Sequence, residues 1–344
     1  MKKKKIFAIA FVLLSLGIFL GYKFLGPATK TPNGEFFYIK TGASAADVSN
    51  ELVAKKYLPS ATWFNFTKKI MGYKKIQPGR YKITKGMSLF KLVKMLKNGR
   101  QAKMKLVITK IRTKEKLAEK LGKMFEFDSL QMIRFLNDNQ KLSNYHVDSN
   151  SVMAIVMPYT YNVTWNSSPV QIFEKFYTAY KNFWTEERKT KADSLHISPI
   201  QVSTLASIIE EETNRKDDKY KIASTYLNRV KIGMKLQADP TVKFALKDFS
   251  LKRITGQYLT VDSKFNTYKY AGIPPGPICT PSLESIDAVL DAPKTDYLYF
   301  VASHNFDGSS IFTSNYADHL KYARLYQQEL TRRMDSSKKA KANQ

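Results

Sequence analysis

The sequence predicts an α+β protein with an N-terminal transmembrane helix, a small α+β domain and then a larger mixed α+β region. Three observations support this fold class. A lysine-rich start is followed by an almost wholly apolar run, short strand-like segments mix with amphipathic helical patterns, and the 344 residues give enough chain for several domains.

The N-terminus reads MKKKK and is followed by the apolar run Ile6–Leu20. A helix needs about 20 residues to span a bilayer, so residues 6–25 are long enough, and Lys23 can extend its ammonium group to the interface. By the positive-inside rule, residues 1–5 stay in the cytoplasm and the rest lies outside. A cleaved signal peptide is the alternative, but no small-x-small cleavage site follows the run. We expect an uncleaved, single-pass anchor in the cytoplasmic membrane.

The composition fits a protein tethered outside the cytoplasm. Cys279 is the only cysteine, so the chain cannot form an intramolecular disulfide. A formal charge of +27 suggests an anionic partner. The lysines are spread along the chain and no nucleic-acid fingerprint accompanies them, so we expect a cell wall or membrane surface and no nucleic acid. The four histidines make no metal-ligand spacing, and we expect neither metal nor cofactor.

Residues 26–35 are predicted to be a linker, and residues 36–103 a small domain. Strands are expected at 36–39 and 78–83, with helices at 45–55, after a cap at Ser60 or Thr62, and after Ser88. The opening G-x-S recurs before two of these helices, at residues 42–44 and 86–88. The pattern is similar to LysM, a small strand–helix–helix–strand glycan-binding module. A plain α+β packing domain explains it equally well.

Residues 104–334 carry the longer helical patterns. We expect a strand at 104–109 and helices at 113–123, 127–145 and 169–189, the last rich in aromatic residues. Ser198-Pro199 is a helix start. Residues 335–344 are polar and lysine-rich, and we expect a disordered tail.

The candidate catalytic residues lie in residues 205–241. Leu205, Ile208 and Ile209 follow helical spacing and lead into Glu210-Glu211-Glu212. Successive helical residues point about 100° apart, so the three carboxylates cannot share one environment. One that borders the apolar stripe would have a raised pKa, whereas a solvated helix face is the plain alternative. A second helical pattern, a Gly233 break and a polar turn follow.

Several separated blocks, in the right order, resemble the endolytic murein transglycosylase family, also called MltG or YceG-like. The blocks cover the last 140 or so residues well and the front half more loosely. They are LASIIEEET (205–213), IASTYLNRVKIGMKLQADPTV (222–242), FNTYKYAGIPPGPICTPS (265–282), DYLYFVAS (296–303) and TSNYADHL (313–320).

The resemblance implies an enzyme that cuts nascent peptidoglycan strands, near the synthesis machinery, at the MurNAc-GlcNAc β-1,4 bond. Glycoside hydrolysis usually takes two carboxyl groups. In a lytic transglycosylase the substrate supplies the nucleophile, the 6-hydroxyl of MurNAc, which closes a 1,6-anhydro ring. One carboxyl then suffices as general acid and base, and it must start neutral, with a pKa raised by partial burial.

The resemblance also assigns roles to residues. Glu210 matches the catalytic glutamate, and its apolar neighbours Ile208 and Ile209 are expected to raise its pKa. Glu212 matches a supporting acidic position, and Glu211 is expected to be solvated. Substrate-binding or supporting roles fall to Asn228, Arg229, Gln237, Asp239, Thr241, Asn266 and Tyr268. For the blocks around residues 237–241 and 266–268, locking of the loops by side-chain hydrogen bonds is the alternative. Asn228 and Arg229 are expected to orient or brace, and Arg229 could pair with Glu212 or with a substrate carboxylate.

This chain departs from the family pattern at one block. Relatives typically have a Glu-Gly pair and later an Asp, where this chain has Ala154-Ile155 and Tyr159. Three other functions are open on the residues alone. They are a hydrolytic muramidase, with Asp239 as the second carboxylate, a catalytically silent wall-binding scaffold, and a general polyanion binder whose binding falls steeply with salt.

Overall fold

The computed structural model describes residues 2–31 and 34–342 and is mixed α+β, as the sequence predicts. The chain folds as two compact units. The first unit comprises residues 1–106, 122–128 and 161–168, and the second comprises residues 107–121, 129–160 and 169–344. Each is described separately.

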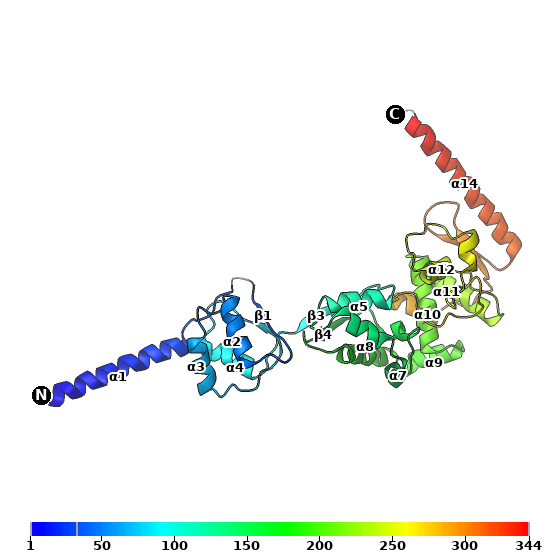
Figure 1. Ribbon diagram of the computed structural model, residues 1–344. Coiled ribbons are helices and arrows are strands. Elements are labelled where there is room, and N and C mark those ends of the chain that lie inside the picture. The colour runs from blue at the N-terminus through cyan, green and yellow to red at the C-terminus, as the bar shows by residue number, and fades with distance from the viewer. Residues whose placement is uncertain (1, 32–33, 343–344) are drawn as a thin grey trace. The chain divides into compact units, whose positions relative to one another are not determined.

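Helix α1 (Lys2–Leu25) opens the first unit. Residues Lys3–Leu25 have a mean hydropathy of 2.1, and the helix is long and apolar enough to cross a membrane. Its side chains are exposed from Ile6 to Phe19, and several become half-buried toward its C-terminal end. The helix is the blue one that opens the chain in Figure 1. The predicted apolar helix is therefore present.

The small domain of the first unit has the order strand–helix–helix–strand–helix. The strands β1 and β2 pair antiparallel, with Phe36 opposite Lys82 and Ile39 opposite Gly79. Ser44 and Ser88, the last residues of the two G-x-S motifs, cap α2 and α4 by accepting hydrogen bonds from backbone N–H groups. The elements are β1 (Phe36–Ile39), α2 (Ala45–Ala54), α3 (Thr62–Ile70), β2 (Gly79–Lys82) and α4 (Leu89–Lys97).

Two details of this domain differ from the sequence prediction. The N-cap of α3 is Ala61, which makes no side-chain capping bond, rather than Ser60 or Thr62. The expected linker 26–35 is partly packed, because Thr29 is 3% exposed and its hydroxyl donates to the carbonyl of Thr84. Pro32, also in that linker, lies outside the described residues. The LysM-like nature of the domain stays a prediction.

The second unit is mostly helical. The aromatic helix expected over 169–189 is two helices, because Thr185 adopts an extended conformation and caps a new helix. The elements are α5 (Lys114–Gly122), α6 (Ser129–Leu136), α7 (Asn139–Leu142), α8 (Pro169–Phe183), α9 (Glu186–Ser194), α10 (Pro199–Glu212), α11 (Lys216–Lys231), α12 (Asp239–Leu246) and α13 (Leu283–Leu290), with 3-10 turns at Ser143–Tyr145, Val152–Ile155 and Gly256–Thr260. The strands β3 (Met104–Val107) and β4 (Thr160–Val163) pair with each other, and most of their residues belong to the first unit.

Helix α10 lies at the centre of the second unit. It starts with a capping box, in which Ser198 and Gln201 bond to each other's backbone N–H groups, and with Pro199 at its first turn. All residues from Val202 to Ile209 are buried, because α10 contacts α9, α11, α12 and α13 on its different sides (Figure 1). The helix ends at Glu212, where Thr213 turns extended. Only its first and last turns therefore reach a surface.

The C-terminal part consists of a hairpin and a long helix. Strands β5 (Tyr299–Ala302) and β6 (Ser310–Thr313) pair antiparallel, and α14 (Tyr316–Ala342) packs on both. The expected disordered tail is helical as far as Ala342, because the helical pattern of α14 continues into it (Figure 1). Residues 343 and 344 lie outside the described residues.

Candidate active site

The last turn of α10 brings the three adjacent glutamates to one polar hollow. This hollow has a volume of about 350 Å³ and is lined by Lys110, Glu210, Glu211, Glu212, Thr213, Asn214, Arg215 and Gly308. The glutamates point in different directions, because successive residues of an α-helix are rotated by about 100° around its axis. Each carboxyl consequently has its own set of partners.

Glu210 is held by hydrogen-bond donors from two other helices. Its Oε2 atom accepts from the hydroxyls of Ser282, at 2.5 Å, and Ser285, at 2.6 Å. The Ser282 N–H adds a bond of 3.3 Å. Lys219 of α11 places its ammonium 3.4 Å from the same oxygen and 3.1 Å from Glu284, and its side chain is only 6% exposed. The carboxyl is thus fixed by four donors at one oxygen.

These donors decide the charge of Glu210. Burial raises its pKa, but the hydroxyls of Ser282 and Ser285 and the charge of Lys219 outweigh that effect and hold the pKa below its usual value. The expectation that the apolar border of Ile208 and Ile209 raises the pKa of Glu210 is therefore wrong for the chain without substrate. Glu210 is an anion at neutral pH.

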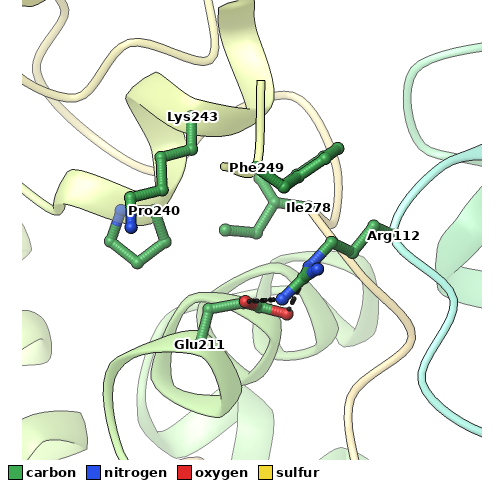
Figure 2. A pocket seen from close by; sticks show the side chains of 6 residues that line it. All are labelled: Arg112, Glu211, Pro240, Lys243, Phe249 and Ile278. Atoms are coloured by element: carbon green, nitrogen blue, oxygen red, sulfur yellow. Dashed lines mark hydrogen bonds and ion pairs between the residues drawn. The ribbon is translucent and has the colours of Figure 1, made fainter. Parts of the chain in front are cut away.

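Glu211 is not solvated, contrary to the sequence prediction. Its side chain is 14% exposed and makes ion pairs with Lys110, at 3.1 Å, and Arg112, at 2.9 Å. Figure 2 shows the Arg112 guanidinium against this carboxylate, beside a smaller hollow of about 50 Å³ that Phe249 and Lys243 also line. Burial raises the pKa of Glu211, but the bonds from Arg112 and Lys110 lower it further, so Glu211 is also an anion.

Glu212 differs from its two neighbours in protonation. Its Oε1 accepts a hydrogen bond of 2.8 Å from the hydroxyl of Tyr226, a residue of α11 that is 1% exposed. Desolvation of the carboxyl, with a smaller contribution from the negative charge of Asp239, raises the pKa of Glu212 to about 7. The chain thus holds one carboxyl that is partly protonated at neutral pH beside two that are ionised.

Asn228 and Arg229 bind backbone carbonyls. The Asn228 amide donates to the carbonyls of residues 295 and 297, at 2.9 and 3.0 Å. Arg229 is 6% exposed and donates to Leu298, at 2.7 Å, and to Leu236, at 2.6 Å. The sequence left open a pairing of Arg229 with Glu212 or with a substrate carboxylate. Instead its guanidinium braces the segment before β5 and the turn before α12, and its charge acts on Glu212 at longer range.

The remaining predicted residues come together around the turn that starts α12. Thr241 is buried and bonds to the Ala238 carbonyl and to the Thr267 hydroxyl, at 2.7 and 2.9 Å. Asn266 is buried and donates to the carbonyls of residues 259 and 261. These contacts match the loop-locking alternative. The exceptions are exposed Gln237, which has a positive φ of 52°, and the Asp239 carboxylate, which accepts from the Tyr268 hydroxyl at 2.6 Å.

The departures from the family pattern lie in the core. Ala154 and Ile155 are 3% and 1% exposed, and Tyr159 packs against the main hydrophobic cluster of the second unit. A glutamate at position 154, where relatives have one, would therefore meet buried, apolar surroundings here. The structure gives these three residues packing roles.

Sequence reasoning missed the groups that set the charges of Glu210 and Glu211. Ser282 and Ser285 come from the N-terminal turn of α13, where Ser282 is the N-cap, and Ser-x-x-Ser at a helix start was the available signal. Lys219 is one of many lysines and gave no signal. Lys110 and Arg112 stand two residues apart in the loop between β3 and α5, and both side chains reach Glu211.

The site can exchange protons with a bound molecule. It combines a partly protonated carboxyl with a hydrogen-bonded carboxylate, beside an open polar hollow. Within residues 2–31 and 34–342, no group of three His, Cys, Asp or Glu side chains is arranged to hold a metal ion. The chemistry that these residues can provide is acid–base chemistry.

Comparison with known proteins gives consistent matches over most of the chain. The model of the YceG-like family matches residues 37–325. A protein of Bacillus subtilis named endolytic murein transglycosylase is 29% identical over 303 residues, covering 84% of this chain and 83% of that protein. A Streptococcus pneumoniae protein of the same name is 25% identical over 356 residues, covering 92% of this chain and 64% of that longer protein.

A solved structure shares the fold. The crystal structure of a YceG-like protein from Listeria monocytogenes matches with a TM-score of 0.56 and 29% identity, over 83% of this chain and 97% of that one. The family match spans both units, from the first strand of the small domain into α14. The chain therefore belongs to the YceG-like family.

Proposed function

We propose that this chain is an endolytic murein transglycosylase that cleaves the MurNAc-GlcNAc β-1,4 bond within peptidoglycan strands and leaves 1,6-anhydroMurNAc ends. The names of the Bacillus and Streptococcus relatives support the general activity. The observation that carries the proposal is the position of Glu210, which borders an open polar hollow while four donors fix its carboxyl. Such a fixed carboxyl meets the geometric demand on a general acid and base.

In the proposed mechanism Glu210 moves a proton twice. Its Oε2 atom is occupied by donors, so Oε1 gives a proton to the glycosidic oxygen as the bond from that oxygen to C1 breaks. The 6-hydroxyl oxygen then bonds to C1, and the same carboxylate takes the hydroxyl proton. No water is consumed, and Glu210 ends protonated for the next cycle.

In this mechanism the pKa of Glu210 must rise when glycan binds, so that the carboxyl takes up a proton before the bond is cleaved. The Lys219 ammonium is closer to Glu284, at 3.1 Å, than to Glu210, at 3.4 Å, so it has a second carboxylate to pair with. The hydroxyls of Ser282 and Ser285 can rotate toward sugar oxygens. A bound glycan also removes water from the carboxyl, and desolvation favours the neutral form.

A hydrolytic muramidase is the second candidate, and one observation favours it. Glu212, with a pKa of about 7, and the Glu210 anion border the same hollow. Two carboxyls with pKa values pushed apart are typical of an acid paired with a base or nucleophile. In that reading Glu212 is the acid and Glu210 the second carboxylate, in place of Asp239.

The other sequence-predicted residues are proposed to support the cleft. Gln237 and Tyr268 are assigned to substrate contact, because Gln237 is exposed and Tyr268 presents a ring beside Asp239. Asp239 also raises the pKa of Glu212. Asn228, Arg229, Thr241 and Asn266 are assigned to holding the loops that carry them.

The front of the chain is proposed to hold the enzyme at its substrate. Helix α1 would be a single-pass anchor in the cytoplasmic membrane, with Lys2–Lys5 inside and the rest of the chain outside. The small domain would be a LysM-like glycan-binding module, a proposal supported by its order β1–α2–α3–β2. Contact with the peptidoglycan synthesis machinery stays a prediction from the family resemblance.

The test is a digest of purified peptidoglycan with residues 26–344 of this chain, which keep the packed Thr29, and with its Glu210→Gln, Glu211→Gln and Glu212→Gln variants. Mass spectrometry distinguishes anhydro from reducing ends. Anhydro ends from all proteins except Glu210→Gln are expected. Loss only in Glu212→Gln would move the acid to that residue, and reducing ends that need both Glu210 and Glu212 would indicate a muramidase. No product from any correctly folded protein would favour a binding scaffold.

A further inference from the structure

Helix α3 of the small domain exposes an apolar stripe. Trp63, Phe66 and Ile70 stand at i, i+3 and i+7, which puts them on one helix face. Phe66 is 45% exposed and Ile70 is 61% exposed, whereas Phe64 and Thr67 on the adjoining face are fully buried in the core. Trp63 also packs against the edge of the domain core, whereas Phe66 and Ile70 lie outside it and are accessible to a further contact.

The stripe continues the apolar surface of α1. The rings of Phe19 and Trp63, of Phe24 and Phe66, and of Trp63 and Phe66 each lie 5.8 Å apart, centre to centre. These aromatic side chains form one connected cluster at the C-terminal end of α1. The apolar helix thus leads directly into the stripe on α3.

Lys23 indicates the level of this cluster relative to a bilayer. Its ammonium lies 5.4 Å from the Phe19 ring centre and 5.8 Å from that of Trp63. A lysine near the end of a spanning helix keeps its charge at the headgroup level. Phe19 is four residues earlier, about 6 Å along the helix axis, so Trp63 lies at the boundary between headgroups and acyl chains.

We propose that α3 rests in the outer interface of the membrane, with Trp63, Phe66 and Ile70 against the lipid. Tryptophan is the residue type most characteristic of that level, because its ring is apolar and its N–H is polar. Exposed Lys69, next to Ile70 in the last turn of α3, meets anionic headgroups. The small domain then contacts the bilayer directly and is not attached to it through α1 alone. This inference rests on the proposed membrane anchor.

The test uses the full chain reconstituted in phosphatidylcholine–phosphatidylglycerol vesicles that contain brominated lipids, which quench nearby tryptophan fluorescence. The chain has three tryptophans, and the Trp63→Phe variant gives the background from Trp165 and Trp184. The difference between the two chains is the Trp63 signal. We expect shallow bromines to quench it more than deep ones, and expect the variant Phe66→Ser/Ile70→Ser to lose most of that quenching.

A matched control and an extraction step separate the outcomes. Ile232, which is 59% exposed in the second unit, supplies the control variant Ile232→Ser, which should keep the quenching. A chain that alkaline carbonate extracts from the vesicles would overturn both the anchor and this inference. A retained chain with unquenched Trp63 would overturn this inference alone. If its oligomeric state also changed in Phe66→Ser/Ile70→Ser, a second copy would be the occupant of the stripe.

Discussion

Replacing Glu212 with glutamine tests the electrostatics of the site directly. Burial raises the pKa of Glu212 from 4.5 to about 7. Each pH unit between these two values corresponds to about 1.4 kcal/mol, so ionised Glu212 destabilises the folded chain by at most about 3 kcal/mol. The figure is an upper limit, because Glu212 is only partly buried and water screens its exposed part. Glutamine keeps the shape of the side chain and still accepts the hydrogen bond from Tyr226.

The sign of the effect follows from the direction of the shift. A group whose pKa is higher in the folded state binds a proton more tightly there, so its contribution to stability is fully present below pH 4.5 and is lost as the pH rises through 7. The free energy of unfolding of the unmodified chain should therefore fall between pH 4.5 and 7 relative to that of Glu212→Gln. At pH 8 the variant should be the more stable protein.

Urea unfolding of residues 26–344, followed by circular dichroism at several pH values, measures this difference. The matched control is Glu211→Gln, where the sign reverses. The pKa of Glu211 is lowered by Arg112 and Lys110, so its contribution is present above its unfolded pKa and is lost as the pH falls through its folded pKa. Glu211→Gln should thus be the less stable protein at neutral pH. A difference between Glu212→Gln and the unmodified chain that stays constant from pH 5 to 8 would refute the reasoning.

Three further changes test other parts of the site. Lys219→Met removes a charge that stabilises the Glu210 anion, so the pKa that governs activity should move upward in the pH–rate profile of peptidoglycan digestion; an unchanged profile would argue against Glu210 as the titrating group. Arg229→Met should lower the free energy of unfolding by about 3 kcal/mol, measured by urea unfolding, because buried carbonyls lose their donor. Thr241→Val should cost about 1–2 kcal/mol in the same assay by breaking three buried hydrogen bonds, and no loss would mean that the turn is not held by them.

The fold could be predicted where the pattern is local. Phe36–Ile39 is a strand as expected, because a short run of aromatic and β-branched residues and a following turn specify it without long-range information. The aromatic segment 169–189 was expected as one helix and is two, because apolar periodicity does not register the break that Thr185 makes as an N-cap. The tail beyond residue 334 was expected to be disordered on composition, yet it continues the helix of α14. In the first case the apolar pattern does not show a helix break, and in the second the composition does not show that a preceding helix continues.

The site could be located from the sequence, but its charges could not. The three glutamates were expected to lie in different environments, because helix geometry requires it. Which environment each one meets depends on Ser282, Lys110 and Tyr226, residues from segments 14 to 101 positions away in the chain. Apolar neighbours in sequence were a poor guide, since Ile208 and Ile209 point into the core and leave the Glu210 carboxyl to its donors. The family resemblance consequently favours Glu210 as the acid, whereas the raised pKa of Glu212 favours Glu212. Glu210 can be the acid only if glycan binding protonates it. The glutamine variants test which carboxyl the reaction needs, and the pH–rate profile of Lys219→Met tests whether Glu210 is the group that titrates.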